Sequence, residues 1–295
     1  MSDNTTQPQP VSIDTILPSA MALRAESGGV ARAATDPLAV FVLSILAGAF
    51  ISFGAVFATT VGAGSIGPDA LLPYGVTRLL TGLVFSVGLI LVVVGGAELF
   101  TGNNMLVMAW ASGKVTTGAV LANWTIAFIG NFIGAIATAA LIFLSTQYTF
   151  GGGAVGLNAL TIANGKCALS FVPAFTLGIL CNALVCLAVW MCYGARTTID
   201  RVVTIIAPIS AFVAAGFEHS IANIYFIPTG LFIKAGAPDT FWTAIGKTPA
   251  DFEALTWANF IFANLIPVTV GNIVGGSVMV AAVYWFVYLR QRPSH

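Results

Sequence analysis

Six long apolar segments, almost free of charged residues, alternate with short polar connections along the chain. Each segment is long enough to cross the hydrocarbon core of a bilayer, which takes about 20 helical residues. The connections, including residues 62–73, 151–165 and 194–201, are rich in Gly, Pro, Asp and Lys and predict turns outside the hydrocarbon. No segment shows the period-two alternation of a β-barrel strand, so the pattern predicts an all-α integral membrane protein. The six predicted spans cover residues 38–61, 79–110, 115–148, 167–193, 202–233 and 255–289.

Two of these spans, the second and the fifth, contain a polar, glycine-bearing interruption, and the two interruptions match. Residues 96–103 read Gly-x-Glu-x-x-x-x-Asn, and residues 216–223 repeat the same residues at the same spacing. Within a bilayer, backbone that leaves the helix must face a cavity or buried polar groups. The sequence therefore predicts that helices 2 and 5 are broken and that each break lines a path.

A second match shows that the whole unit is duplicated. Asn123 is followed by Gly130-Asn131-x-x-Gly134, and Asn264 is followed at equal spacing by Gly271-Asn272-x-x-Gly275. Each unit holds three spans, an odd number, so the second unit must be inverted in the membrane relative to the first. We predict a transport domain over residues 38–290, with repeat one at about 38–148, repeat two at about 167–289, and residues 235–251 as an insertion in repeat two.

Composition agrees with lipid surroundings. Of 295 residues, 58% are hydrophobic and 7% are charged, and the mean hydropathy is +0.94. A soluble domain carries about 25% charged residues. Because the formal net charge is zero, nothing electrostatic favours binding of nucleic acid.

The basic residues predict that both chain ends face the cytoplasm. With a cytoplasmic N-terminus, 7 basic residues lie inside and 4 lie outside, and cytoplasmic loops carry the excess of Lys and Arg. Residues 1–37 then form a cytoplasmic N-terminal segment and residues 291–295 a cytoplasmic tail. Apolar positions at helical spacing in residues 14–32 fit an amphipathic helix, and a solvated leader fits as well. Whether this segment gates a pore stays open.

Ionisable groups inside the membrane are costly and need a reason, and Glu98, Glu218 and His219 are the clear cases. The glutamates either hold the loosened backbone of their own break or contact a substrate. His219 has no counterpart, since Leu99 takes its place in repeat one, which favours proton or anion handling over a purely structural role. Lys166, at the predicted outer end of span four, either attracts anions or extends to the membrane interface.

The motifs at the breaks, together with Gly178-Ile179-Leu180-Cys181-Asn182, resemble the formate/nitrite transporter family over about residues 38–290. This resemblance implies a homopentamer in the cell membrane of a prokaryote, with six-helix protomers, an aquaporin-like inverted repeat and one pore in each protomer. Residues 224–228 resemble formate-type members. The resemblance further implies that Thr101 and His219 face each other at the pore centre, with Asn182 and Asn272 nearby and Glu218 supporting the histidine. It places Lys166 in the outer vestibule, an outer constriction at Phe85, Leu89 and Phe212, and an inner constriction at Leu99, Phe100 and Val185.

The implied function is transport of small monovalent anions of weak acids, with formate first and nitrite or hydrosulfide through the same pore as the alternative. An apolar constriction excludes ions, whereas a neutral weak acid crosses cheaply. We therefore hypothesise proton coupling, in which the anion is protonated either by relay from His219 or from bulk water. An intramembrane enzyme is the rival class, but the chain lacks a paired metal-binding motif and a nucleophile dyad at sensible spacing, so we expect no enzyme, no cofactor and no metal. A purely structural membrane protein would have no use for two costly helix breaks.

Overall fold

The computed structural model describes residues 14–65 and 72–290, and this part of the chain consists of helices and contains no strands. The predicted C-terminal tail and the first part of the predicted N-terminal segment lie outside the described residues. The α-helices are α1 (Pro18–Ala33), α2 (Pro37–Val61), α3 (Tyr74–Gly95), α4 (Val107–Ala111), α5 (Thr117–Leu144), α6 (Ala154–Cys167), α7 (Phe171–Gly194), α8 (Thr198–Ala215), α9 (Ser220–Gly236), α10 (Asp239–Ile245), α11 (Trp257–Asn259), α12 (Ile266–Ile273) and α13 (Val283–Tyr288). Short 3₁₀ helices are η1 (Gly102–Leu106), η2 (Gln147–Thr149) and η3 (Pro249–Phe252), and π-helical turns are η4 (Phe260–Leu265) and η5 (Val274–Ala282).

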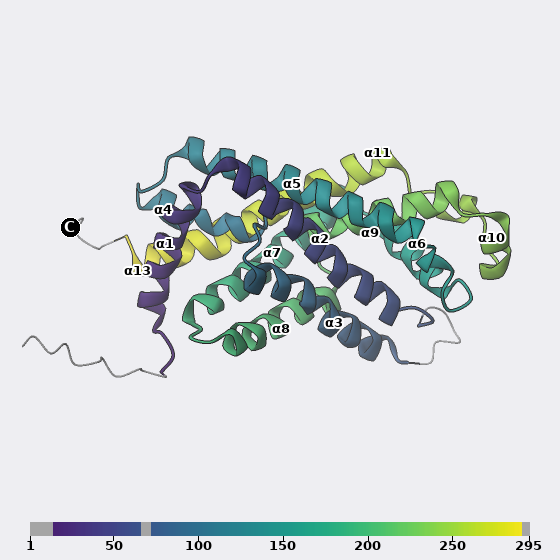
Figure 1. Cartoon of the computed structure of the whole chain (residues 1–295), viewed down its shortest axis with the longest axis horizontal. Coiled ribbons are helices and arrows are strands. Elements are labelled where there is room, and N and C mark those ends of the chain that lie inside the picture. Colours follow the sequence, from purple (N-terminus) through teal and green to yellow (C-terminus); the bar gives the residue numbers. More distant parts are fainter. Residues whose placement is uncertain (1–13, 66–71, 291–295) are drawn as a thin grey trace, which may run out of the picture.

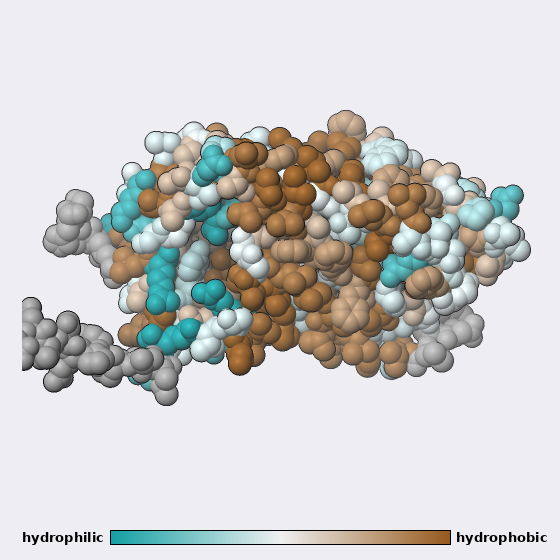
Figure 2. Space-filling model, viewed as in Figure 1, coloured by the Kyte–Doolittle hydropathy of each residue, from teal (hydrophilic) through white to brown (hydrophobic). Residues whose placement is uncertain are grey.

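The six predicted spans are confirmed. Within the described residues, six helical stretches are long and apolar enough to cross a membrane: Pro37–Val61, Tyr74–Gly95, Thr117–Leu144, Phe171–Gly194, Thr198–Ala215 and Pro249–Tyr288. Figure 2 shows an apolar band between two more polar ends of the molecule. Exposed apolar side chains of these spans include Phe53, Phe57 and Leu83. This is the surface that a bilayer would cover.

Both predicted helix breaks are present. Gly96 directly follows α3 and Gly216 directly follows α8, and their backbones have φ of 74° and 78°. This left-handed conformation is available to glycine without steric cost, which explains the glycine at the start of each interruption. After the breaks the chain resumes as η1 and α4 in repeat one and as α9 in repeat two.

Small residues let the helices of each repeat pack closely. A Cβ atom added to Gly134 of α5 would overlap the carbonyl oxygen of Ile45 in α2, and one added to Gly275 would overlap that of Ile179 in α7. The two contacts hold equivalent positions in the two repeats. The helices that precede the repeats, α1 and α6, lie at opposite ends of the long axis of the molecule (Figure 1), as expected for inverted units.

Two short segments settle questions left by the sequence. Residues 18–33 form α1, with Met21, Ala22 and Ala25 buried, so the helix and not the solvated leader is present.

The prediction of a turn over residues 151–165 was wrong, because α6 occupies most of it. Gly153, with φ of 93°, precedes the helix. Helix α6 is stabilised by burial of its apolar side chains, which include Val155, Ala159, Leu160 and Ala163.

Candidate functional site

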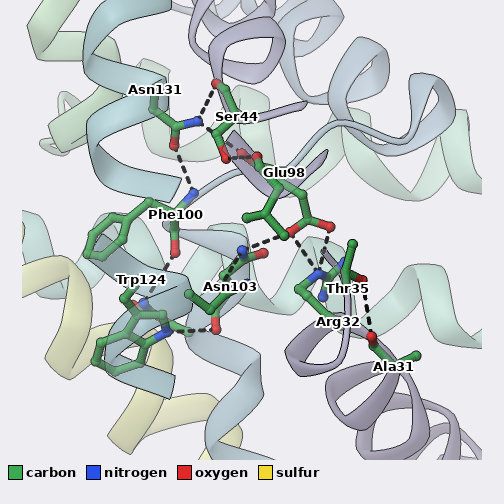
Figure 3. A network of polar contacts seen from close by, with 12 residues as sticks. Ala31, Arg32, Thr35, Ser44, Glu98, Phe100, Asn103, Trp124 and Asn131 are labelled. Carbon is green, nitrogen blue, oxygen red and sulfur yellow. Dashed lines mark hydrogen bonds and ion pairs between the residues drawn. The ribbon is translucent and has the colours of Figure 1, made fainter. Parts of the chain in front are cut away.

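The break after α3 is held by the Glu98 carboxylate, which two side chains, Asn103 and Arg32, contact directly (Figure 3). Asn103 Nδ2 donates to Glu98 Oε2 at 2.8 Å and to Asn123 Oδ1 at 2.9 Å. Arg32 Nε, from α1, donates to Glu98 Oε1 at 3.0 Å. Burial lowers the pKa of Arg32, but the Glu98 carboxylate and Tyr193 outweigh it, so this pKa lies above its ordinary value and the guanidinium stays charged.

The break after α8 repeats this network. Asn223 Nδ2 donates to Glu218 Oε2 at 2.6 Å and to Asn264 Oδ1 at 2.7 Å, and Lys166 Nζ, from α6, donates to Glu218 Oε1 at 2.8 Å. Side chains at both breaks thus bind the glutamate carboxylates. Of the two roles expected for Glu98 and Glu218, these contacts fit that of holding the loosened backbone of the break. The two networks differ in the basic partner and in Asn264, whose Nδ2 also donates to Glu218 Oε2 and to the Lys166 carbonyl, both at 3.1 Å.

Two asparagines satisfy the backbone of the breaks. Asn131 Oδ1 accepts from the Phe100 N–H at 2.9 Å, while its Nδ2 donates to the carbonyls of Ser44 and Glu98 at 2.7 and 2.9 Å. Asn272 does the same for the Ser220 N–H and for the carbonyls of Gly178 and Glu218, at 2.9, 2.8 and 3.0 Å. Unpaired backbone groups are costly in a buried apolar environment, so each asparagine is a structural support for its break.

Two cavities approach the breaks from opposite ends. The α6-side cavity has a volume of about 420 Å³ and is lined by Arg78, Phe85, Lys166, Phe212, Glu218 and His219, among others. The α1-side cavity has a volume of about 250 Å³ and is lined by Arg32, Leu89, Glu98, Leu99 and Arg201, among others. Many lining residues are equivalent in the two repeats, such as Glu98 and Glu218.

A buried polar contact lies between the cavities. Thr101 Oγ1 and His219 Nε2 are 3.0 Å apart, and the two residues are 0% and 3% exposed. His219 borders the α6-side cavity, whereas its counterpart Leu99 borders the α1-side cavity. The Phe212 ring stacks on the imidazole with centroids 5.9 Å apart, and Phe85 meets Phe212 edge to face at 5.6 Å.

The hydrogen bonds of His219 determine which ring nitrogen carries hydrogen. Its Nδ1 accepts from the Ala222 N–H at 3.1 Å and thereby caps the N-terminus of α9. An accepting Nδ1 is unprotonated, so in the neutral ring Nε2 carries the hydrogen and donates to Thr101 Oγ1. The hydroxyl hydrogen of Thr101 can then turn toward a third group.

Asn182 of α7 orders the same region from the other side. Its Nδ2 lies 2.9 Å from Asn104 Oδ1, 2.7 Å from the Asn272 carbonyl and 3.2 Å from the Thr101 carbonyl. The equivalent position in α2 is Gly48. Asn182 is thus a feature of repeat two alone, and it fixes the backbone of Thr101.

The remaining predicted residues are distributed as follows. Phe85 and Phe212 lie together, but Leu89 lines the other cavity, with Leu99. Phe100 packs against the rings of Phe128 and Trp124, at 5.2 and 6.2 Å, and Val185 is buried; neither lines a described cavity. Residues with roles that the sequence analysis did not assign are Arg32, Arg78, Asn103, Asn123, Asn131 and Arg201.

The architecture defines the class of this protein: an all-helical membrane protein of two inverted repeats with two opposed cavities is a channel or transporter and not an enzyme. A family model described as formate/nitrite transporter matches residues 19–286, and the chain belongs to this family.

Relatives and solved structures agree with this assignment. The chain is 46% identical over 282 residues to the formate channel FocA of Escherichia coli strain K12, covering 96% of this chain and 98% of that one. It is 42% identical over 256 residues to FocA of Haemophilus influenzae, covering 87% and 89%. Among solved structures, a pentameric formate channel with formate bound matches with a TM-score of 0.81 at 45% identity, covering 86% of this chain and 98% of that one. An FNT family ion channel matches with a TM-score of 0.75 at 28% identity, covering 90% and 98%.

Proposed function

We propose that this protein conducts formate across the membrane, through the α6-side cavity, the Thr101–His219 contact and the α1-side cavity. The observation that carries the proposal is that His219 of this buried contact lines the α6-side cavity, while Leu99 and Gly102, which flank Thr101 in the chain, line the α1-side cavity. Similarity to proteins named formate channels supports formate as the substrate. Nitrite and hydrosulfide, the conjugate bases of small acids, are the alternative substrates of the same pore.

The barrier favours a neutral form of the substrate. Phe85 and Phe212 on one side and Leu89 and Leu99 on the other are each at most 3% exposed. Removing water from a charge at such a place costs several kcal/mol, whereas a neutral acid pays far less. Formate therefore crosses with a proton. Lys166 with Arg78 at one cavity, and Arg32 with Arg201 at the other, outnumber the single glutamate of each lining and so raise the local anion concentration.

Proton coupling proceeds by one of two routes. In the first, His219 takes up a proton to become the imidazolium, and its Nε2–H then passes one proton through the Thr101 hydroxyl to formate, which restores a neutral ring. In the imidazolium Nδ1 also carries hydrogen, so this route requires His219 to give up the cap that Nδ1 provides on α9. In the second, formate takes a proton from bulk water before the barrier, and the polar pair only offers hydrogen bonds to the neutral acid.

Assembly and orientation complete the proposal. We propose a homopentamer, as in the solved channel whose description names that assembly, with one pore in each protomer and the apolar band shared between lipid and neighbouring subunits. Both chain ends lie in the cytoplasm, which makes the α1-side cavity the inner one. The excess of Lys and Arg on that side supports this orientation.

The test is flux of formate, nitrite and hydrosulfide into proteoliposomes across external pH 5 to 8, with wild type and His219→Asn. Fastest flux of formate, with a pH dependence that flattens in the variant, supports the formate pore and the histidine route. An unchanged pH dependence in the variant rejects the histidine route and leaves protonation from bulk water. Faster flux of nitrite or hydrosulfide rejects formate as the preferred substrate.

A further inference from the structure

The α1-side cavity is lined by one ion pair and by one further basic side chain that has no acidic partner in the described part of the chain. Its lining includes Arg32, which pairs with Glu98, and Arg201, which lies in the first turn of α8. Among the described residues, the Arg201 guanidinium has no hydrogen-bond or ion-pair partner. The neighbouring Asp200 carboxylate accepts from the N–H groups of Arg196 and Thr197 and caps α8. The cavity lining therefore carries two cations and one carboxylate.

The opposite cavity shows what such an arginine can do when it is engaged. Arg78 is the fifth residue of α3, and α3 packs against α8. Its Nε donates to the Ala214 carbonyl at 3.0 Å and its Nη2 donates to the Val213 carbonyl, at the end of α8. Helix C-termini attract cations, so the charge of Arg78 is partly satisfied there.

Arg201 lies near the end of α3, as Arg78 lies near the end of α8, but its guanidinium does not bind the carbonyls there. In the inverted frame it lies one helical turn from the position equivalent to Arg78, and Val92, Val93 and Gly96 from the end of α3 line the same cavity. No described carbonyl of α3 accepts from its guanidinium. The linings of the two cavities therefore have the same formal charge. In the α6-side cavity the Arg78 guanidinium is bound to backbone carbonyls, whereas in the α1-side cavity the Arg201 guanidinium is free to bind an anion.

We propose that the α1-side cavity is a binding site for a small doubly charged oxyanion, such as sulfate or phosphate, held between Arg201 and Arg32. A guanidinium presents paired N–H donors that match two oxygens of such an anion. The same cavity is also lined by the apolar side chains of Leu89 and Leu99, each 2% exposed, where desolvation of two charges would be too costly. The dianion stays in the mouth and excludes the monovalent substrate. This inference rests on the proposed function, because exclusion is detected as loss of formate flux.

The experiment measures formate flux in proteoliposomes of neutral lipid, with sulfate on one face and chloride at equal ionic strength on the other. A cleavable tag after α13, which packs on α1, reports which face exposes the α1-side mouth. Sulfate should inhibit from the α1 side and have little effect from the α6 side. Arg201→Gln should raise the sulfate concentration for half inhibition about tenfold, as loss of a charge-assisted hydrogen bond predicts. Arg196→Gln removes a charge on the same side but outside the cavity lining, and it should leave both flux and inhibition unchanged.

The outcomes separate the site from the transport function. Equal inhibition from both faces, or unchanged sulfate sensitivity in Arg201→Gln, overturns the site even when formate flux is normal. If anionic lipid without sulfate reproduces the block, lipid headgroups occupy Arg201 and the soluble oxyanion is the wrong ligand. If wild type conducts no formate, the proposed function fails, and the site is judged by calorimetric binding of sulfate to purified protein. In that case tighter binding by wild type than by Arg201→Gln supports the site, and equal binding overturns it.

Discussion

Arg32 and Lys166 hold equivalent positions in the two repeats, five residues before the start of α2 and α7 respectively. Each reaches from a short helix to the glutamate of a break, Arg32 to Glu98 at 2.9 Å and Lys166 to Glu218 at 2.8 Å. The symmetric unit therefore includes α1 and α6 and is longer than the repeats predicted from the motifs. Each mouth of the molecule has its own cation fixed to its own helix break.

Removal of the cation that pairs with either glutamate should lower the stability of the protein, and removal of Lys166 should lower it more than removal of Arg32. The Lys166 side chain is 16% exposed and that of Arg32 is 28% exposed, so water replaces the lost partner less well at Glu218. We expect Lys166→Met to lower the stability of the detergent-solubilised protein by roughly 3 kcal/mol, the range for a buried carboxylate left unpaired. Arg32→Met should cost less, and the pair Lys166→Met with Glu218→Leu should recover part of the loss. Thermal unfolding measures all three variants against wild type, and an equal loss in both single variants would contradict this order.

The two supporting asparagines should act locally. Leucine at Asn272 leaves the Ser220 N–H without its acceptor, and leucine at Asn131 does the same for the Phe100 N–H. Each unsatisfied buried group costs about 1–3 kcal/mol. Hydrogen exchange should therefore accelerate at Ser220 in Asn272→Leu and at Phe100 in Asn131→Leu, with the other break as the internal control. Acceleration at both breaks in each variant would show that the breaks open as one unit.

Close helix contacts give a prediction with a matched control. A methyl group at Gly134 or Gly275 would collide with a backbone carbonyl of the neighbouring helix, whereas Gly165 in α6 has open space around its Cβ position. Alanine at either tight site should destabilise the protein by about 1–3 kcal/mol, the usual cost of overpacking. Gly165→Ala should stabilise it by roughly 0.5–1 kcal/mol, because alanine is the better helix former. Thermal unfolding of the three variants checks the signs, and a loss at Gly165 would contradict the packing argument.

The sequence predicted the spans and the duplication because both leave local signals. Long apolar runs identify membrane helices directly, and two copies of one motif at equal spacing identify the repeat. Helix α6 was missed because the glycines at 151–153 and the polar end at Asn164 and Lys166 read as a loop, while its buried face is short.

The site was harder to predict because its contacts join distant parts of the chain. Arg32 and Glu98 are 66 residues apart, and hydropathy alone treats Arg32 as an interfacial charge. Asn272 was predicted next to the pathway, whereas its side chain serves the backbone of the break. The need to pair every buried N–H and C=O, not the chemistry of a substrate, determines such positions, and that need is visible only in the folded structure.

Substitution of Thr101 tests whether its hydroxyl takes part in formate transport. Valine keeps the branched shape of Thr101 but leaves His219 Nε2–H without its acceptor and offers no hydroxyl to the substrate. Serine keeps the hydroxyl and loses only a methyl group. If the neutral acid passes by exchanging hydrogen bonds with this pair, Thr101→Val should reduce formate flux by about tenfold, the value of one buried hydrogen bond of roughly 1.4 kcal/mol, and Thr101→Ser should stay near wild type. Flux is compared at equal amounts of folded protein, judged by thermal unfolding. Equal flux in the valine and serine variants would mean that the pair closes the barrier by its size alone, and that formate crosses without a hydrogen bond from Thr101.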